Sequence, residues 1–377
     1  MTALRRKDWR QDDSPSCLVD FHPVIVAFAA AALLTGACHR GEAGAPRDPD
    51  EVPEARFGFE LAGYLDPPGP EGFWEPADIE VDDAGGAIWI VDRKADCVYR
   101  YDLDGVYRGR VSRQGSGPGE LSEALALGMV GDTLWVFNAG NRRIDYFGMG
   151  GETLATQPLP DGSGAVVDVI AVGGQFVAST VFGQTPLVRF PRAPGAATAG
   201  SARGFGQELA SMEADLAGRA APKTRAAIPP VYRVVLVGGR IWALHLYLPL
   251  VGIFAPDGRL IRLVTYPADP VEPGGESVQE IDGVRRRVQN APLDPGGAIG
   301  LLEGTAGEIY LLTHQSDSGR QRLYALNRDG DLIGRVESPF AGWLAVSAGD
   351  GGNQRYVLAA RGETEEPAVI RLRARRP

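Results

Sequence analysis

The chain has 377 residues, a hydrophobic fraction of 44%, 50 glycines and 28 prolines. This composition is typical of many short strands joined by turns, and it argues against a helical protein. The net charge of −10 argues against sequence-independent binding to nucleic acid phosphates, which needs a basic surface. We therefore expect an all-β protein without a nucleic acid partner.

Residues 1–37 have the pattern of a bacterial export signal. Basic residues at 5–7 precede an apolar run at 24–34, which is too short to span a membrane comfortably. The run ends in Leu-Thr-Gly-Ala before Cys38, which resembles the lipobox of bacterial lipoproteins. The resemblance implies cleavage before Cys38 and lipidation of this residue. Plain secretion, an uncleaved anchor and a cytosolic protein are the alternatives. We predict a location in the bacterial cell envelope, at the outer membrane on the periplasmic side if the host is Gram-negative.

Residues 38–54 contain almost no apolar side chains and are rich in proline, glycine and acidic residues. A segment of this composition cannot bury a core. We therefore predict a disordered tether over 38–54 and a single folded domain over 55–377. A lipid at Cys38 would hold this domain beside a membrane without spanning it.

Six short apolar strands, each preceded by a small turn, carry a bulky residue at one fixed place, roughly 40 to 70 residues apart. These residues are Trp89, Trp135, Val177, Trp242, Tyr310 and Tyr356. Most copies continue to another apolar strand that is closed by a glycine turn, as at Asp104-Gly105. A period of this size built only from strands and turns is typical of β-propeller blades. We predict six four-stranded antiparallel blades, with the bulky residues packing between sheets.

The first five blades each supply their strands in chain order, although the third has no clear fourth strand. The predicted strands are 77–82, 87–91, 98–101 and 106–111; 125–127, 133–137, 143–147 and 152–155; 166–172, 175–178 and 187–190; 232–237, 241–244, 252–254 and 260–264; and 298–302, 309–313, 322–326 and 332–336.

The last blade offers three strands, at 343–346, 356–360 and 368–372. We predict that residues 56–62, just after the tether, supply its fourth strand. Pairing the first and last strands closes the ring and removes an aggregation-prone edge.

Two insertions interrupt the spacing of the blades. A helix is predicted over 207–221, where Leu209, Met212 and Leu216 recur at helical spacing. A second helix is predicted over 276–290, where four apolar residues again form one stripe. Each insertion precedes the first strand of a blade. The two helices are therefore expected to cover part of one mouth of the central channel.

Two blades resemble a known family. Residues 76–92 resemble the opening of an NHL-type repeat, and 138–144 (Asn-Ala-Gly-Asn-Arg-Arg-Ile) resemble its signature, with Asn138 in place of the usual Asp. Residues 114–120 resemble the glycine-rich turn between blades of bacterial six-bladed propeller lipoproteins. The other blades are placed by spacing alone. The resemblance implies a fold and a location but transfers no substrate, because such propellers include scaffolds, peptide binders and a few enzymes.

Polar residues open or follow the loops after the second strand of several blades, and blade alignment gathers them on one face. We predict these residues as ligand contacts: Asp92, Asn138, His245, His314 and Arg361. For Asp92 and Asn138 the competing interpretation is a capped turn, in which the side chain accepts nearby backbone N–H groups.

The sequence predicts a membrane-tethered propeller that binds a protein, peptide or glycan. One alternative is a hydrolase or lyase with a divalent metal held by Asp92, His245 and His314 at the channel mouth. We find no third histidine in register for such a site, so no cofactor is favoured. Another alternative is a purely structural component of the envelope.

Overall fold

Short apolar strands separated by glycine turns make up most of the computed structural model. It describes residues 51–56, 58–69, 72–181, 183–196, 200–219, 230–267, 276–281, 284–289, 297–304, 306–315, 321–338, 354–361 and 366–374. These residues all lie in one compact unit, Gly41–Pro377. Over the described ranges, no helix has the length and apolar character needed to cross a membrane.

The first blade shows how the sequence builds each sheet. β2 (Pro76–Asp82), β3 (Ala87–Asp92), β4 (Cys97–Asp102) and β5 (Tyr107–Val111) pair in that order as an antiparallel sheet. β3 is buried along its whole length, whereas β5 alternates between exposed and covered residues, because only β5 forms an outer edge. The turn between β4 and β5 places Gly105 at φ 87°, a left-handed conformation that favours glycine.

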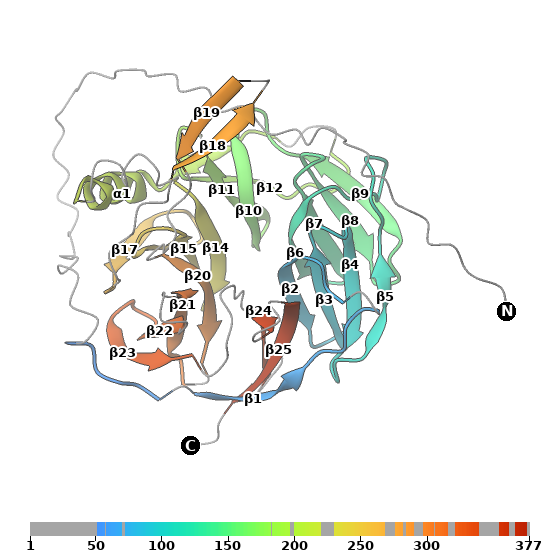
Figure 1. Cartoon of the computed structure of the whole chain (residues 1–377). Coiled ribbons are helices and arrows are strands. Elements are labelled where there is room, and N and C mark those ends of the chain that lie inside the picture. Colours follow the sequence, from blue (N-terminus) through green and yellow to red (C-terminus); the bar gives the residue numbers. More distant parts are fainter. Residues whose placement is uncertain are drawn as a thin grey trace. The chain divides into compact units, whose positions relative to one another are not determined.

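Four further antiparallel sheets repeat this strand order along the chain (Figure 1). They are β6 (Ala124–Val130), β7 (Thr133–Asn138), β8 (Arg143–Gly148) and β9 (Thr153–Pro158); β10 (Ala165–Val172), β11 (Gln175–Val181), β12 (Leu187–Pro191) and β13 (Arg203–Phe205); β14 (Tyr232–Val237), β15 (Arg240–His245), β16 (Leu250–Phe254) and β17 (Leu260–Thr265); and β20 (Ala298–Glu303), β21 (Ile309–Gln315), β22 (Gln321–Leu326) and β23 (Leu332–Glu337). The protein is therefore an all-β propeller. The strand that the sequence did not define in the third blade is the short β13.

A further sheet brings the two ends of the domain together. β24 (Gln354–Arg361) pairs with β25 (Glu366–Ala374), and β25 pairs with β1 (Phe59–Tyr64). The predicted pairing of the first and last strands is confirmed. The strand predicted at 343–346 lies outside the described residues. The structure therefore shows five four-stranded blades and one three-stranded sheet, not six complete blades.

Bulky residues of the second strands pack each sheet against the next. Trp89 of β3 lies in one buried cluster with Leu127 of the following blade. Trp135 of β7 meets Phe176 edge to face, with ring centroids 5.2 Å apart. Trp242 lies in one cluster with Leu301 of the next blade. The predicted packing role of these aromatic residues is confirmed, and truncating such a residue costs about 3–5 kcal/mol of stability.

One of the two predicted helical insertions is a helix. α1 (Gln207–Arg219) packs Leu209, Met212 and Leu216 against the third and fourth blades. The apolar spacing of this segment predicted the correct element.

The second predicted helix is wrong, because the segment forms an antiparallel hairpin of β18 (Glu276–Ile281) and β19 (Val284–Gln289). The apolar residues of both strands are β-branched, which favours strands. Only Asp and Gly separate the strands in the sequence, and this dipeptide is a strong hairpin signal. The local turn chemistry therefore outweighs the helical spacing.

The start of the domain is held by the fifth blade before it reaches β25. Ala55 donates its backbone N–H to the carbonyl of Arg335 at 2.7 Å, and Arg335 donates to the carbonyl of Pro53 at 2.8 Å. Val52 is buried. The last residues of the predicted tether thus already pack against β23.

We predict that the closing strand stabilises the whole propeller. Phe59 of β1 is fully buried in one cluster with Ile370 and Leu372 of β25. Phe59→Ala should lower the free energy of unfolding by about 3–5 kcal/mol, with a single transition in urea. Leu61→Ala is the control on the same strand, because Leu61 is 45% exposed. Equal losses in both variants, or a separate early transition, would contradict this role.

Candidate functional site

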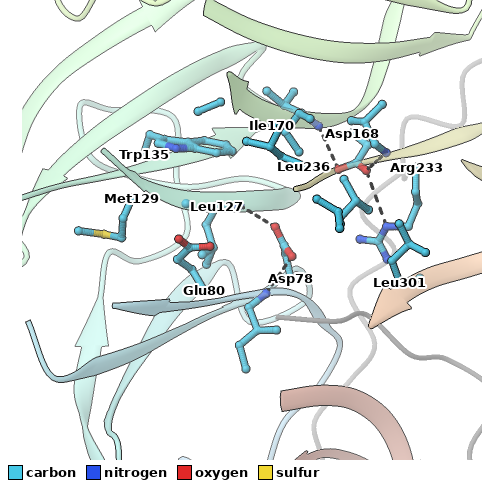
Figure 2. Close-up of a pocket in the computed structure, with 18 of the residues that line it drawn as sticks. Asp78, Glu80, Leu127, Met129, Trp135, Asp168, Ile170, Arg233, Leu236 and Leu301 are labelled. Atoms are coloured by element: carbon cyan, nitrogen blue, oxygen red, sulfur yellow. Dashed lines mark hydrogen bonds and ion pairs between the residues drawn. The ribbon is translucent and has the colours of Figure 1, made fainter. Parts of the chain in front are cut away.

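The charged residues that line the interior lie on the first strands of four of the five four-stranded blades. β2, β6, β10, β14 and β20 contact one another in chain order. They enclose a cavity of about 350 Å³ (Figure 2). Its wall includes Asp78 and Glu80 from β2, Asp168 from β10 and Arg233 from β14. These strands therefore surround a polar channel and not a dry core.

Asp78 joins the first blade to the second. Its Oδ2 accepts the backbone N–H of Leu127 on β6 at 3.0 Å, and its Oδ1 accepts that of Ile79 at 2.9 Å. The pairing of β2 with β3 shifts register between Pro76 and Asp78, and such a bulge re-aims a side chain. β6 is the innermost strand of its blade, so no further strand pairs with its inner edge. The Asp78 carboxylate thereby provides a hydrogen-bond acceptor for the Leu127 N–H on this edge.

Asp168 repeats this arrangement between the third and fourth blades. Its Oδ2 accepts the N–H of Val234 on β14 at 2.8 Å, and its Oδ1 accepts that of Val169 at 3.0 Å. A register shift again precedes the aspartate, between Val166 and Asp168. An aspartate that accepts a backbone N–H from the next blade therefore occurs at two junctions between blades.

Arg233 supplies the positive charge of the channel wall. Its Nε lies 3.7 Å from Asp168 Oδ2, and its Nη2 donates to the carbonyl of Ala77 at 3.2 Å. The guanidinium group therefore reaches from the fourth blade to both the third and the first.

The channel raises the pKa of its carboxyl groups. Burial raises the pKa of Asp78 to about 7, with nearby Arg233 opposing the shift and Asp168 adding to it. Burial, and then the negative charge of Asp78, raise the pKa of Glu80 to about 8. The pKa of Asp168 is also raised by burial, against the opposing charge of Arg233. At neutral pH, Glu80 is consequently mostly protonated in the empty channel.

A second cavity of about 540 Å³ adjoins the first and shares Asp168 and Arg233 in its wall. It lies at the mouth of the channel, where the innermost strands begin and the loops after β3 and β15 contribute Arg93 and Tyr247. Arg93 forms an exposed ion pair with Glu75. Both side chains are well exposed, so this pair adds little to stability and leaves the mouth open to an incoming ligand.

Asp92 and His245 accept hydrogen bonds from the backbone of the loops that form this mouth. The carboxylate of Asp92 accepts the N–H groups of Trp74 at 2.8 Å, Glu75 at 3.0 Å and Ala95 at 3.0 Å. Asp92 is fully buried. It therefore fixes the backbone beside the mouth, as a capping carboxylate does, and does not face the cavity.

His245 acts in the same way in the fourth blade. Its Nδ1 accepts the N–H groups of Tyr247 at 3.0 Å and Leu248 at 3.2 Å. Burial lowers the pKa of His245 to about 3, so the ring is neutral and its proton must sit on Nε2. Nε2 lies 3.7 Å from Glu213 Oε2 on α1. A nitrogen that carries a proton is not a metal ligand.

The metal alternative also requires its ligands to meet. Asp92 and His245 each serve a separate turn, and no contact between them is found in the described residues. In the described part of the chain, no group of three or more His, Cys, Asp or Glu side chains is placed to hold a metal ion. His314 lies in β21, but its side chain is not among those described. The geometry seen at Asp92 and His245 is that of turn supports.

The remaining predicted contacts are only partly visible. Asn138 is buried; it accepts the N–H of Ser122 at 2.9 Å and donates to the carbonyl of Glu120 at 2.9 Å and to Asp145 Oδ2 at 2.6 Å. This is the capped turn that the sequence offered as the competing interpretation. Arg361 lies in β24 with its side chain outside the described set, and Cys38 lies outside the described residues. Ligand contact by the predicted set therefore stays a prediction.

Sequence reasoning missed the channel residues. Asp78 and Glu80 stand in a predicted strand, as do Asp168 and Arg233, but none of them is among the predicted contacts. Ionisable residues in the first strand of a blade are the signal that could have identified them. Such residues are costly in a core but are satisfied beside a channel.

Comparisons with known proteins agree on the fold. No family model and no curated protein matches the sequence. A member of the DUF4221 family from Bacteroides vulgatus aligns with a TM-score of 0.53 at 7% identity, covering 85% of this chain and 98% of that one. A protein of Bacteroides fragilis described as exported gives 0.52 at 8% identity, with coverage of 86% and 98%. Virginiamycin B lyase from Staphylococcus aureus gives 0.46 at 13% identity, with coverage of 82% and 88%. The two likenesses above 0.5 agree with the fold described here and show nothing beyond the fold, and the NHL resemblance stays a prediction.

We predict that Glu80 makes stability depend on pH. The folded state holds the pKa of Glu80 at about 8, whereas an unfolded glutamate titrates near about 4.3. Between these values the folded state binds more protons, so the free energy of unfolding falls as pH rises. Glu80→Gln should flatten the decline in Tm between about pH 5.5 and pH 8.5. Glu60→Gln, which removes an exposed carboxyl group on β1, should leave the slope unchanged. Parallel Tm profiles for wild type and Glu80→Gln would contradict the assignment.

Proposed function

We propose that this protein is a binding module of the bacterial cell envelope, tethered by a lipid at Cys38, that recognises a protein, peptide or glycan at the mouth of its channel. The observation that carries this proposal is the pair of adjoining cavities that share Asp168 and Arg233. Their sizes, about 540 and 350 Å³, lie in the range of ligand sites. A cavity of that size takes the end or a side group of a polymer, while the rest of the polymer stays outside.

The surroundings of the mouth support recognition without a large rearrangement. Its backbone is fixed by the buried Asp92 and His245, and preorganised loops lose little entropy on binding. Trp74, 48% exposed, follows Phe73 and is held through its own N–H by Asp92. Lys94 lies over its ring at 5.8 Å from the centroid. An exposed, positioned indole beside a cavity suits a sugar ring or a peptide side chain.

We further propose a ring of six blades, in which residues 343–346 complete the sheet of β24, β25 and β1. Among the described strands, β24 pairs only with β25, and this open edge and the contact of β24 with β2 support this count. In such a ring, His314 and Arg361 stand near the ends of the second strands of their blades, one and two places later than Asp92 and His245 stand in theirs. They remain part of the proposed ligand-binding face.

Filling the mouth cavity with a bulky side chain should weaken the binding of ligands to the channel. Val167 lines the mouth cavity, and Val167→Trp would occupy it with an indole. The probes are muropeptides and tripeptides of acidic, neutral and basic charge, with binding measured by calorimetry. We expect any probe that binds the wild type to lose at least about tenfold in affinity, equivalent to about 1.4 kcal/mol.

Val106→Trp is the control for adding an indole, because Val106 is 41% exposed just before β5. Its affinities should match the wild type. Equal affinities of the wild type and Val167→Trp for every bound probe, with both variants folded, would show that ligands do not use the mouth.

The tether makes a separate prediction. Cys38→Ser removes the sulfur that would carry the lipid, and stable anchoring of a protein without a membrane span takes two signals, such as two acyl chains. The variant should move from the membrane fraction to the soluble fraction and lose palmitate labelling. Retention in membranes without label would contradict lipid anchoring while leaving the binding proposal unaffected.

A further inference from the structure

The cavity of about 350 Å³ is the inner cavity of the channel. Among its carboxyl groups, Glu80 is the one with little compensation by positive charge. The charged residues in the wall of this cavity are Asp78, Glu80, Asp168, Glu303 and Arg233. Asp168 forms an ion pair with Arg233, and Glu303 forms one with Arg328 at 2.9 Å. Among the described lysines and arginines, none forms an ion pair with Glu80. Its neighbours on β2 are the like charges of Asp78 and Asp82, offset only by the backbone N–H of Met129 on β6.

Apolar surface and an unused donor lie in the same cavity. Leu236 of β14 is 43% exposed and lines this cavity. Trp135 is 3% exposed, and its indole Nε1–H has no hydrogen-bond partner. Trp89 and Trp242 share this unpaired N–H, but only Trp135 lines the cavity. Figure 2 shows Trp135, Met129 and Leu236 around the same space as Glu80. Leu236 is apolar surface that a ligand in the cavity would cover, whereas the Trp135 Nε1 has almost no accessible surface and lies beside Gly128 of β6.

We propose that the inner cavity takes a primary ammonium group on a short apolar stem, as at the end of a lysine side chain. Glu80 and Asp78 would hold the ammonium group, and Leu236 and Met129 would contact the stem. This inference rests on the proposed function and names the ligand class of the same channel.

Binding of a cation here must be coupled to loss of a proton. The pKa of Glu80, about 8 in the empty cavity, means that the group is mostly neutral at pH 7. An ammonium group favours the carboxylate form, so its binding displaces the proton to solvent. Arg233 from β14 and the acids Asp78, Asp168 and Glu303 face the same space, and their balance stays net negative when ionised. Affinity should therefore rise with pH until the amine itself loses its proton near about pH 10.

Calorimetry with a matched pair of small probes tests this inference. N-acetyl-lysine methylamide carries the ammonium group, and N-acetyl-norleucine methylamide has the same stem without it. We expect the lysine probe to bind at least about tenfold more tightly, with a heat that changes with the ionisation enthalpy of the buffer. Its affinity for the wild type should rise about tenfold between pH 6.5 and pH 8.5.

Glu80→Gln should remove most of the proton release and weaken the lysine probe about tenfold or more, whereas Glu60→Gln should change neither. Equal binding of both probes, no binding of the lysine probe at about 10 mM, or an affinity independent of pH would each overturn the ammonium assignment. The pH series needs no variant, so it stands even if Glu80→Gln folds poorly.

The two proposals fail in different ways. A neutral or acidic probe that binds the wild type and is lost in Val167→Trp, while the lysine probe does not bind, overturns the ammonium assignment and retains the channel site. Failure of all probes to distinguish the wild type from Val167→Trp counts against the channel site itself.

Discussion

The propeller depends on packing between sheets that cannot be stable alone. A four-stranded sheet of this size has two faces that must be covered. Each face is covered by the sheet of a neighbouring blade. Trp89, Trp135 and Trp242 cross these junctions and are almost completely buried. Because every sheet needs a neighbour on both sides, the series must end on itself, and the pairing of β1 with β25 provides this closure. Val369 of β25 then packs in one cluster with the aromatic residues of the first blade.

The same arrangement creates the charged channel. Packing the sheets face to face leaves the edges of the innermost strands turned toward one another, too far apart to pair as strands along their length. Asp78 and Asp168 bridge two of these edges by accepting backbone N–H groups from the next blade. Their carboxylates are therefore structural first. Glu80 also accepts a backbone N–H, from Met129 on β6, but burial and a like charge oppose its ionisation, and a group with such a perturbed pKa is a candidate for function.

Two of the predicted ligand contacts, Asp92 and His245, support the loops beside the candidate site and do not line its cavities. Asp92 and His245 were chosen because they end the second strands of their blades, and they do lie beside the channel mouth. Their side chains are turned inward, where they accept backbone N–H groups of the loops that form the mouth. Polar residues at such positions fix the loop, while less conspicuous neighbours such as Arg93 and Tyr247 line the cavity.

The strands of five blades could be predicted from the sequence, because strand alternation, glycine turns and a recurring bulky residue are local signals; the closing strand could be predicted from an incomplete last blade. The sequence also determined α1, but it misassigned the segment of β18 and β19, where helical spacing and an Asp-Gly turn compete. The candidate site, in contrast, depends on how the blades pack together. Asp78, Glu80, Asp168 and Arg233 come from three different blades. Their proximity, burial and raised carboxyl pKa values arise from ring closure, and no spacing along the chain encodes the distance between side chains of different blades.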